Sequence, residues 1–337
     1  MDTGLVLQLR DAAAMLHTQL VAVRDAAAEL ARTHRSALMP GRTHGQHAVP
    51  ITFGYKMAVW VDELDRQLAG LDRATEQAMV VQFGGACGTL ASVGAVGLDV
   101  RRELAAELDL DDPAITWHVT RDRLLDLVFQ LTSVAIGLKR FSRMVITLGG
   151  NETAELAEPF HHGKVGSSTM PHKRNPVLCE TIWSAAVLVE DGFRSMMTAA
   201  VQEHERDMAS WQVEWEALPR LCTNAHHALT LTVEVLEGLT VREARMRTNV
   251  DATDGLIMSE ALMMRLAPHL GRQDAHDVVY DAAMAAQDGQ GSLLDLVQLD
   301  ERVASLAEAT QLVDPAALVD GAEAQVDHVL ADQHARP

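Results

Sequence analysis

The sequence predicts an all-α protein in which long helices form a central bundle. Of its 337 residues, 48% are apolar but only 4% are aromatic, and an apolar set rich in alanine, leucine and valine favours packed helices over sheets. Apolar residues also recur every three or four positions over several long runs, which is the period of an α-helix. A chain of this length has room for roughly two domains and a sizeable core.

The first predicted helix runs from Leu5 to about Arg35. Its apolar residues repeat every seven positions and so provide a seam for a neighbouring helix. These residues are Leu9, Leu16, Val23 and Leu30. Pro40 and Gly41 then predict the end of helical structure, and the stretch from Arg42 to Pro50 is expected to be a polar loop.

A second helix is expected from Thr52 to about Gln82, again with apolar residues at helical spacing. Five glycines between Gly84 and Gly97 interrupt the pattern. Glycine permits tight turns and close backbone approach, but this stretch lacks the strand-then-helix context of a phosphate-binding loop. The sequence therefore does not predict a nucleotide site there.

Three more helical stretches follow. One runs from about Thr120 to Glu155, another begins near Val177, and the last begins near Trp211 and continues towards Leu236. The first of them shows apolar residues at three- and four-residue spacings, and all three are expected to join the bundle.

After about Val241 the helical pattern becomes shorter and is broken by glycine and proline. We therefore expect a central long-helix bundle over residues 1–241 and a small C-terminal helical domain over residues 242–337. Long helices with apolar faces on several sides cannot all be covered inside one slim bundle. The sequence thus favours a homo-oligomer over long helices that curve around a monomeric core.

The charge of the chain limits its partners. It carries 28 basic and 47 acidic side chains, a formal net charge of −19, which repels nucleic acid and anionic membranes. A carboxylate substrate is repelled as well, so any anion site must gather basic groups locally. One segment does so, with Lys164, His172, Lys173 and Arg174.

Cysteine and histidine patterns give no sign of a metal or a disulfide. The three cysteines are far apart without a C-x-x-C pair, and neighbouring histidines on a helix point too far apart to share one ion. The sequence also shows no signal peptide and no apolar run long enough to cross a bilayer. We expect a cytoplasmic protein without a metal or a cofactor.

The segment from Gly166 to Pro176, GSSTMPHKRNP, concentrates groups suited to proton transfer next to a carboxylate. Removing or adding a proton at such a carbon creates an enolate-like dianion, which needs clustered donors and a well-placed acid or base. Ser167 and Ser168 offer hydroxyls, while Lys173 and Asn175 offer a cation and an amide. The alternative is a surface loop with a helix cap, because serine and asparagine are common there.

This segment resembles the signature loop of the fumarase/aspartase superfamily, whose members add or eliminate groups across a carbon–carbon bond beside a carboxylate. The resemblance implies that Ser167 transfers the proton, with Ser168 as the close alternative. It also implies that Lys173 and Asn175 contact the substrate carboxylate and that Met170 helps to seat the loop.

A second block, GRTHGQHAVP from Gly41 to Pro50, is similar to the superfamily's G-R-T-H motif. The resemblance implies substrate binding by Arg42 and Thr43, and binding or proton transfer by His44. The histidine's partner in the family is a glutamate shortly after the signature loop, and Glu180 occupies that place here. His47 has no such counterpart and is interpreted as structural.

A third block, from Gln202 to Pro219, is similar to the 3-carboxy-cis,cis-muconate cycloisomerase family, which has a tryptophan-rich E-W-x-x-L-P stretch at this point. Adenylosuccinate lyases instead carry a serine and an arginine that hold a nucleotide phosphate. Trp211 and Trp215 stand near that place here and would leave a phosphate poorly neutralised. Arg206 is a further candidate for substrate binding.

Two more stretches, Gln82 to Ser92 and Thr116 to Leu124, extend the likeness over most of residues 2–220. Superfamily members begin with a further helical domain and a T-S-x-D block, and Met1-Asp2-Thr3 looks like the tail of that block. The chain is therefore expected to be either a fragment or a shortened homologue. Since family sites combine blocks from three subunits of a tetramer, the missing block puts activity in question.

The resemblance implies a cofactor-independent cycloisomerase of aromatic catabolism, in the β-ketoadipate pathway, that closes 3-carboxy-cis,cis-muconate to carboxymuconolactone. One alternative is an adenylosuccinate-lyase-like enzyme that releases fumarate. Another is an inactive helical oligomer.

Overall fold

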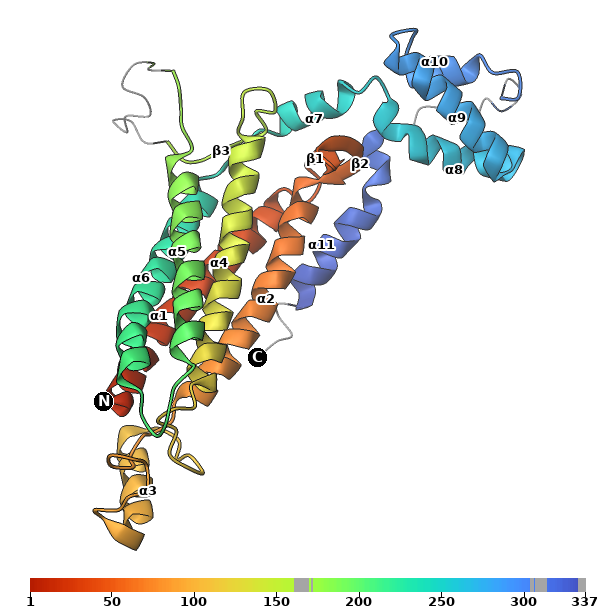
Figure 1. The fold of residues 1–337 in the computed structure, drawn as a ribbon. Helices are drawn as coiled ribbons and strands as arrows, with labels where there is room; N and C mark the ends of the chain where they lie inside the picture. The colour runs from red at the N-terminus through yellow and green to blue at the C-terminus, as the bar shows by residue number, and fades with distance from the viewer. Residues whose placement is uncertain (161–169, 171, 304–305, 307–313, 333–337) are drawn as a thin grey trace. The chain divides into compact units, whose positions relative to one another are not determined.

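A computed structural model describes residues 1–160, 170, 172–303, 306 and 314–332. The predicted all-α class is confirmed, since helices dominate these residues (Figure 1). The α-helices are α1 (Asp2–Thr33), α2 (Phe53–Ala78), α3 (Gly97–Leu108), α4 (Asp122–Leu148), α5 (Val177–Ala199), α6 (Met208–Gly238), α7 (Glu243–Asp251), α8 (Ser259–Leu270), α9 (Arg272–Gln287), α10 (Leu293–Gln298) and α11 (Asp320–Asp332).

Short elements complete the described structure. They are the 3-10 helices η1 (Gly94–Val96), η2 (Leu256–Met258) and η3 (Pro315–Leu318), and the strands β1 (Leu38–Thr43), β2 (Gln46–Thr52), β3 (Leu156–Ala157) and β4 (Thr240–Val241). The strands form two separate pairs, β1 with β2 and β3 with β4. Of the α-helices before α7, the sequence pattern missed only α3, because it directly follows the glycine-rich stretch.

The chain divides into two compact units that are interleaved in sequence. The first holds residues 1–26, 62–149 and 157–239, and the second holds residues 27–61, 150–156 and 240–337. The C-terminal helices thus belong to the same compact unit as two earlier segments. A separate domain over residues 242–337 stays a prediction.

Helices α4, α5 and α6 form the core of the first unit and lie side by side in Figure 1. Their inward faces carry apolar residues, among them Leu131, Ile182 and Leu221, all fully or nearly fully buried. The α5 and α6 backbones approach closely at Gly192, where an added Cβ would lie 3.0 Å from the Cβ of Leu221. Burial of these faces supplies most of the helices' stability, because propensity alone is weak.

The expectation of a polar loop from Arg42 to Pro50 was wrong, because this stretch belongs to an antiparallel β-hairpin in the second unit. Thr43 pairs with Gln46, so His44 and Gly45 form a two-residue turn. Their φ angles of 52° and 78° are those of a type I′ turn, whose twist matches that of the strands. The polar sequence resembles a loop, but histidine and glycine both accept the left-handed conformation that this turn needs.

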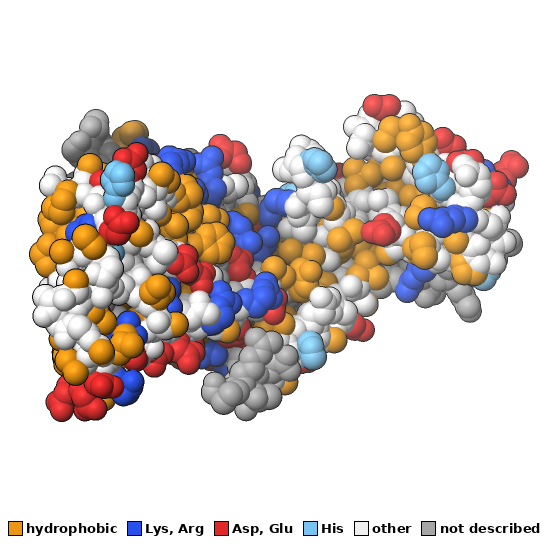
Figure 2. Space-filling model, turned by 60° about the horizontal axis from the view of Figure 1, so that its bottom comes forward, with side chains coloured by type: hydrophobic (Ala, Val, Ile, Leu, Met, Phe, Trp, Pro, Cys, Tyr) orange, Lys and Arg blue, Asp and Glu red, His pale blue; other side chains and the backbone are white. Residues whose placement is uncertain are grey.

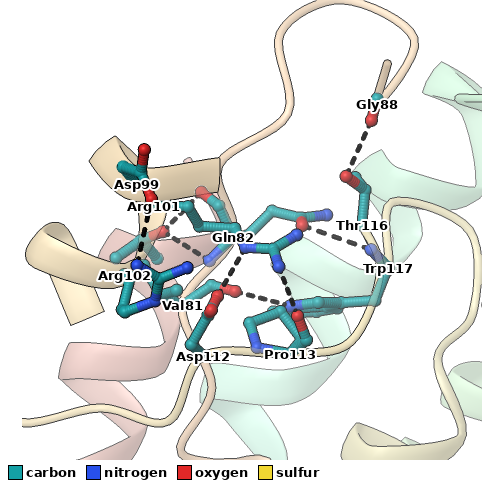
Figure 3. A network of polar contacts seen from close by, with 11 residues as sticks. Val81, Gln82, Gly88, Asp99, Arg101, Arg102, Asp112, Pro113, Thr116 and Trp117 are labelled. Atoms are coloured by element: carbon teal, nitrogen blue, oxygen red, sulfur yellow. Dashed lines mark hydrogen bonds and ion pairs between the residues drawn. The ribbon is translucent and has the colours of Figure 1, made fainter. Parts of the chain in front are cut away.

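Two stretches that carry the family likeness come together in the first unit, as Figure 3 shows. Thr116 Oγ1 donates to the carbonyl of Gly88 at 2.8 Å, and the Trp117 backbone N–H donates to Gln82 Oε1 at 3.2 Å. Trp117 Nε1 also donates to the Val81 carbonyl at 3.0 Å. Side chains from one stretch thereby fix the backbone of the glycine-rich one.

The surface of the bundle helices is partly apolar. Figure 2 shows hydrophobic side chains scattered among charged ones on the face it draws. Large exposed apolar residues on α4, α5 and α6 include Phe129, Ile136, Trp183, Leu188 and Trp215. In the described part of the chain, no helix combines the length and apolar character needed to cross a membrane.

The hairpin turn gives a stability prediction. Gly45→Ala should lower the free energy of unfolding by about 1 kcal/mol, because a side chain is strained at its φ of +78°. Gly4→Ala is the matched control, since neither added Cβ would meet any described atom within 4 Å. Gly4 lies in α1, so alanine there should instead stabilise by up to about 1 kcal/mol. Urea denaturation measures both, and equal effects would contradict the assigned turn.

Candidate functional site

Three of the predicted site residues lie at the start of α5. Lys173 is exposed and Asn175 is half-buried, just before the helix, and Glu180 is exposed in its first turn. Met170 is exposed, and its carbonyl accepts a hydrogen bond from the Lys173 N–H at 3.0 Å. The predicted catalytic residues Ser167 and Ser168 lie outside the described residues. The described groups thus present a cation, an amide and a carboxylate around one helix end.

Arg206 belongs to a polar cluster at the start of α6. Its guanidinium carbon lies 4.2 Å from the centre of the Trp211 ring, and Nη1 lies 3.7 Å from Asp2 Oδ2. Asp2 is buried and also accepts a hydrogen bond from Arg121 Nη2 at 2.9 Å. The same Nη2 donates to Glu214 Oε1 at 2.7 Å. The cluster therefore joins the starts of α1, α4 and α6.

Several buried nitrogens in this cluster have no hydrogen-bond partner among the described residues. They are His118 Nδ1, Arg121 Nε, Arg121 Nη1 and Trp211 Nε1, of which the arginine and tryptophan nitrogens are donors. One acceptor, Glu214 Oε2, shares this property. Because buried donors need acceptors, such a concentration suits the oxygens of a carboxylate ligand or of bound water.

Burial shapes the ionisation of this cluster. It raises the pKa of Glu214, against the opposing effect of the positive charge of Arg121. Burial also lowers the pKa of His118, and the positive charge of Arg206 lowers it further. The cluster thus favours a neutral imidazole beside its two guanidinium groups.

The length of α5 separates these two groups of residues. Lys173 and Asn175 precede its first residue, whereas Arg206 follows its last residue and stands just before α6. Pro159, near the start of α5, lies against Gly238 at the end of α6, so the two helices run antiparallel. The 23 residues of α5 span about 33 Å at a rise of ~1.5 Å per residue. The two groups of one chain therefore cannot touch the same small ligand.

The hairpin of the second unit holds the remaining predicted residues. Arg42 makes a bidentate ion pair with the fully buried Glu155, with Nη1 3.0 Å from Oε2 and Nη2 2.6 Å from Oε1. Asn249 Nδ2 donates to the same Oε1 at 2.8 Å. Thr43 and His44 are exposed at the turn. The structure thus gives Arg42 a partner within the chain and leaves His44 accessible.

Two further basic groups surround the Arg42–Glu155 pair. Burial and then the positive charge of Arg42 lower the pKa of both His47 and Lys56. Glu155 opposes this in each case. Both side chains therefore release their protons more readily here than they would in water.

A cleft of about 700 Å³ lies beside the hairpin, within the second unit. Its polar lining comes from Gln46, His47, Thr253, Ser259 and Gln287, with an apolar part from Leu256 and Ile257. No lysine, arginine, aspartate or glutamate of the described residues lines it. A polyanionic ligand would find no countercharge there, so the cleft is a weaker candidate than the α6 cluster.

Sequence reasoning missed Asp2, His118, Arg121 and Glu214. His118 and Arg121 lie in the Thr116 to Leu124 stretch, and Glu214 lies in the E-W-x-x-L-P block, so the motifs did contain a signal. Their clustering depends on contacts between residues 119 and 93 positions apart, which no local pattern reveals.

Comparison with known families identifies the class of protein. Residues 1–190 match the family model described as "Lyase", and residues 255–329 match the one described as "Adenylosuccinate lyase C-terminus". The chain therefore belongs to the lyase family of the fumarase superfamily, which confirms the predicted membership.

Named relatives cover almost the whole chain. It is 40% identical over 338 residues to a 3-carboxy-cis,cis-muconate cycloisomerase of Pseudomonas aeruginosa, an alignment that covers 99% of this chain and 74% of the relative. It is 38% identical to an N-acetyl-S-(2-succino)cysteine lyase of Enterococcus italicus, over 98% of this chain and 73% of the relative. The crystal structure of a fumarate lyase from Mesorhizobium sp. BNC1 superposes with a TM-score of 0.92 at 42% identity, over 98% of this chain and 75% of that one.

The hairpin ion pair gives a second prediction. Arg42→Met should lower the free energy of unfolding by about 3 kcal/mol, because it leaves the buried Glu155 carboxylate without its guanidinium. The double variant Arg42→Met/Glu155→Met should lose less than Arg42→Met alone, since no buried charge remains. Urea denaturation measures both.

Arg220→Met serves as the control for this cycle. Arg220 pairs with Glu216 on an exposed helix face, where an ion pair contributes little, so stability should hardly change. The role of the ion pair would be contradicted if Arg42→Met/Glu155→Met lost as much unfolding free energy as Arg42→Met and Glu155→Met lose when their separate losses are added.

The lowered pKa of His118 gives a third prediction. Below its ordinary pKa of 6.5 the unfolded chain binds this proton more readily than the folded protein. His118 should therefore stabilise the fold above pH 6.5 and lose this contribution as the pH falls towards the lowered value. His118→Gln should flatten that part of the stability profile, measured by urea unfolding from about pH 5 to about pH 8. The exposed His276→Gln is the control, and an unchanged slope in His118→Gln would refute the assignment.

Proposed function

We propose that this lyase-family protein is a cycloisomerase that lactonises 3-carboxy-cis,cis-muconate. In the reaction a carboxylate oxygen of the substrate adds to one carbon of a double bond, and a proton joins the carbon beside another carboxylate. No atom is lost and no electron acceptor is needed. The names of relatives near 40% identity support this substrate, as do two separate groups of side chains whose charges and donors suit carboxylates.

The roles follow from the chemistry of each group. Lys173 and Asn175 hold the enolate-like charge that develops before protonation, and Ser167, or its neighbour Ser168, delivers the proton. His44 and Glu180 position or polarise the substrate. Arg206, with the buried donors around Trp211, binds a second carboxylate.

One observation carries the proposal of shared sites: helix α5, which is about 33 Å long, stands between Lys173 and Arg206 in one chain. A substrate with several carboxylates can be held at both ends only if different copies supply the two groups. We therefore propose a homo-oligomer, in the form of a tetramer, with sites between subunits. The exposed apolar residues on α4, α5 and α6 are suited to burial between such copies.

The surroundings of Arg206 favour a small substrate without phosphate. Trp211 and Trp215 pack against each other, with ring centres 4.9 Å apart, and Trp211 covers one face of the guanidinium. Asp2 neutralises part of its charge. A phosphate dianion would find less positive charge here than it needs, which disfavours the nucleotide substrate of an adenylosuccinate lyase.

A second candidate is a lyase that releases fumarate from an S-succinyl thioether. A relative of nearly equal identity is named N-acetyl-S-(2-succino)cysteine lyase. Such a substrate also carries carboxylates on both sides of the bond that breaks. The same proton-transfer groups could serve, with elimination in place of intramolecular addition.

The deciding experiment offers both substrates to the purified protein. With 3-carboxy-cis,cis-muconate we expect loss of the conjugated-diene absorbance and formation of the lactone. Release of fumarate from N-acetyl-S-(2-succino)cysteine, without turnover of the muconate, would replace the proposed function by the second candidate. Turnover of neither would refute both.

Shared sites predict complementation between inactive variants. Lys173→Ala and Arg206→Ala should each lower kcat/KM by at least about a hundredfold. Co-refolding them in equal amounts should restore about one quarter of the wild-type activity, because random mixing gives that fraction of sites two intact contributors. Arg220→Ala, on the exposed face of α6, should leave activity unchanged. No recovery on mixing would contradict sites built from different copies.

A further inference from the structure

Helix α5 begins without a capping side chain of its own. Its N-cap residue is Pro176, which provides no side-chain hydrogen bond, although the first N–H groups of a helix need acceptors from outside it. Glu158 supplies them: Oε1 accepts from the Leu178 N–H at 3.2 Å and Oε2 from the Cys179 N–H at 3.0 Å. The carboxylate comes from a segment about twenty residues earlier and replaces a local cap.

A second contact joins the same two segments. The guanidinium carbon of Arg174 lies 4.5 Å from the centre of the Phe160 ring, which is the geometry of a cation–π interaction. Residues 158 and 160 thus hold the chain on both sides of Pro176 through two independent interactions.

The earlier segment is itself fixed to α6. At Gly238 an added Cβ would lie 2.6 Å from the Cβ of Pro159, so only a glycine allows Pro159 to lie this close to the end of α6. Glu158 is the neighbour of this anchored proline. Its hydrogen bonds therefore transmit the position of α6 to the first turn of α5.

The Glu158 carboxylate also limits which groups at the start of α5 can bind a substrate. A helix N-terminus attracts anions through its free N–H groups and its dipole, but here Glu158 occupies the N–H groups of Leu178 and Cys179. A substrate carboxylate is thus left with the side chains that precede the helix.

We propose that Glu158 is a positioning residue for this half of the site. It fixes the first turn of α5 and so sets where Asn175 and Glu180 meet the substrate, without touching the substrate itself. This inference rests on the proposed function, because those side chains are the groups that Glu158 would position.

The two hydrogen bonds accepted by Glu158 predict that its variants lose activity in proportion to the acceptor oxygens they lack. Glutamate offers one oxygen to each of two N–H groups. Glu158→Gln keeps the size of the side chain but leaves a single acceptor oxygen and no charge, and Glu158→Ala removes both acceptors. We expect kcat/KM to fall about threefold for Glu158→Gln and at least about tenfold for Glu158→Ala, with kcat falling at saturating substrate.

Ser292→Ala in the full chain is the matched control. Ser292 caps α10 by accepting from the Asp295 N–H at 3.2 Å, so its loss removes the same kind of bond in the second unit. We expect Ser292→Ala to lower Tm slightly but to keep kcat/KM within about twofold of wild type. Equal losses of kcat/KM in Ser292→Ala and Glu158→Ala would overturn the positioning role, and so would a Glu158→Ala protein with normal kcat/KM.

Two readouts do not depend on turnover. Amide hydrogen exchange at Leu178 and Cys179 should become at least about tenfold faster in Glu158→Ala. The Kd for propane-1,2,3-tricarboxylate, a non-reactive tricarboxylate probe, should rise by a similar factor when measured by calorimetry. A wild-type protein that turns over neither substrate would count against the proposed function, whereas unchanged exchange and Kd in Glu158→Ala would count against the role of Glu158.

Discussion

The first compact unit depends on the ion pairs that the buried guanidinium of Arg121 makes with two carboxylates. Arg121 holds Asp2 at the start of α1 and Glu214 in α6, while standing immediately before α4. Removing Arg121 would take this guanidinium away from two buried carboxylates, which costs several kcal/mol. Because Arg206 shares Asp2 with Arg121, the same ion cluster that joins the helices also orients a candidate substrate-binding residue. The ion pairs that join the helices and the charges around Arg206 therefore cannot change independently of each other.

The second unit repeats this principle around Glu155. Arg42 and Asn249 approach its buried carboxylate from the hairpin and from α7, so an arginine that the family motif connects with substrate also has a structural partner. The exposed His44 belongs to the same hairpin. Its place at the turn follows from the register that pairs Thr43 with Gln46.

The sequence predicted the long helices well, because their apolar residues keep a helical period that burial in α4, α5 and α6 preserves. It failed at the hairpin, where the turn is defined by the φ angles of His44 and Gly45 rather than by hydrophobic spacing. For the candidate site, motifs singled out Lys173, Asn175 and Arg206 but gave no distances between them. The partners of Arg121 and the capping role of Glu158 arise from contacts between distant segments, which local patterns do not encode.

The number of residues in helix α5 fixes the distance between its two ends. Each residue added to an α-helix advances it by ~1.5 Å and turns it by about 100°, so a single insertion in α5 would both displace and misdirect the groups at one end. In a symmetric assembly of identical chains that error would recur at every site at once. Selection should therefore accept exchanges of side chains along this helix far more readily than changes of its length.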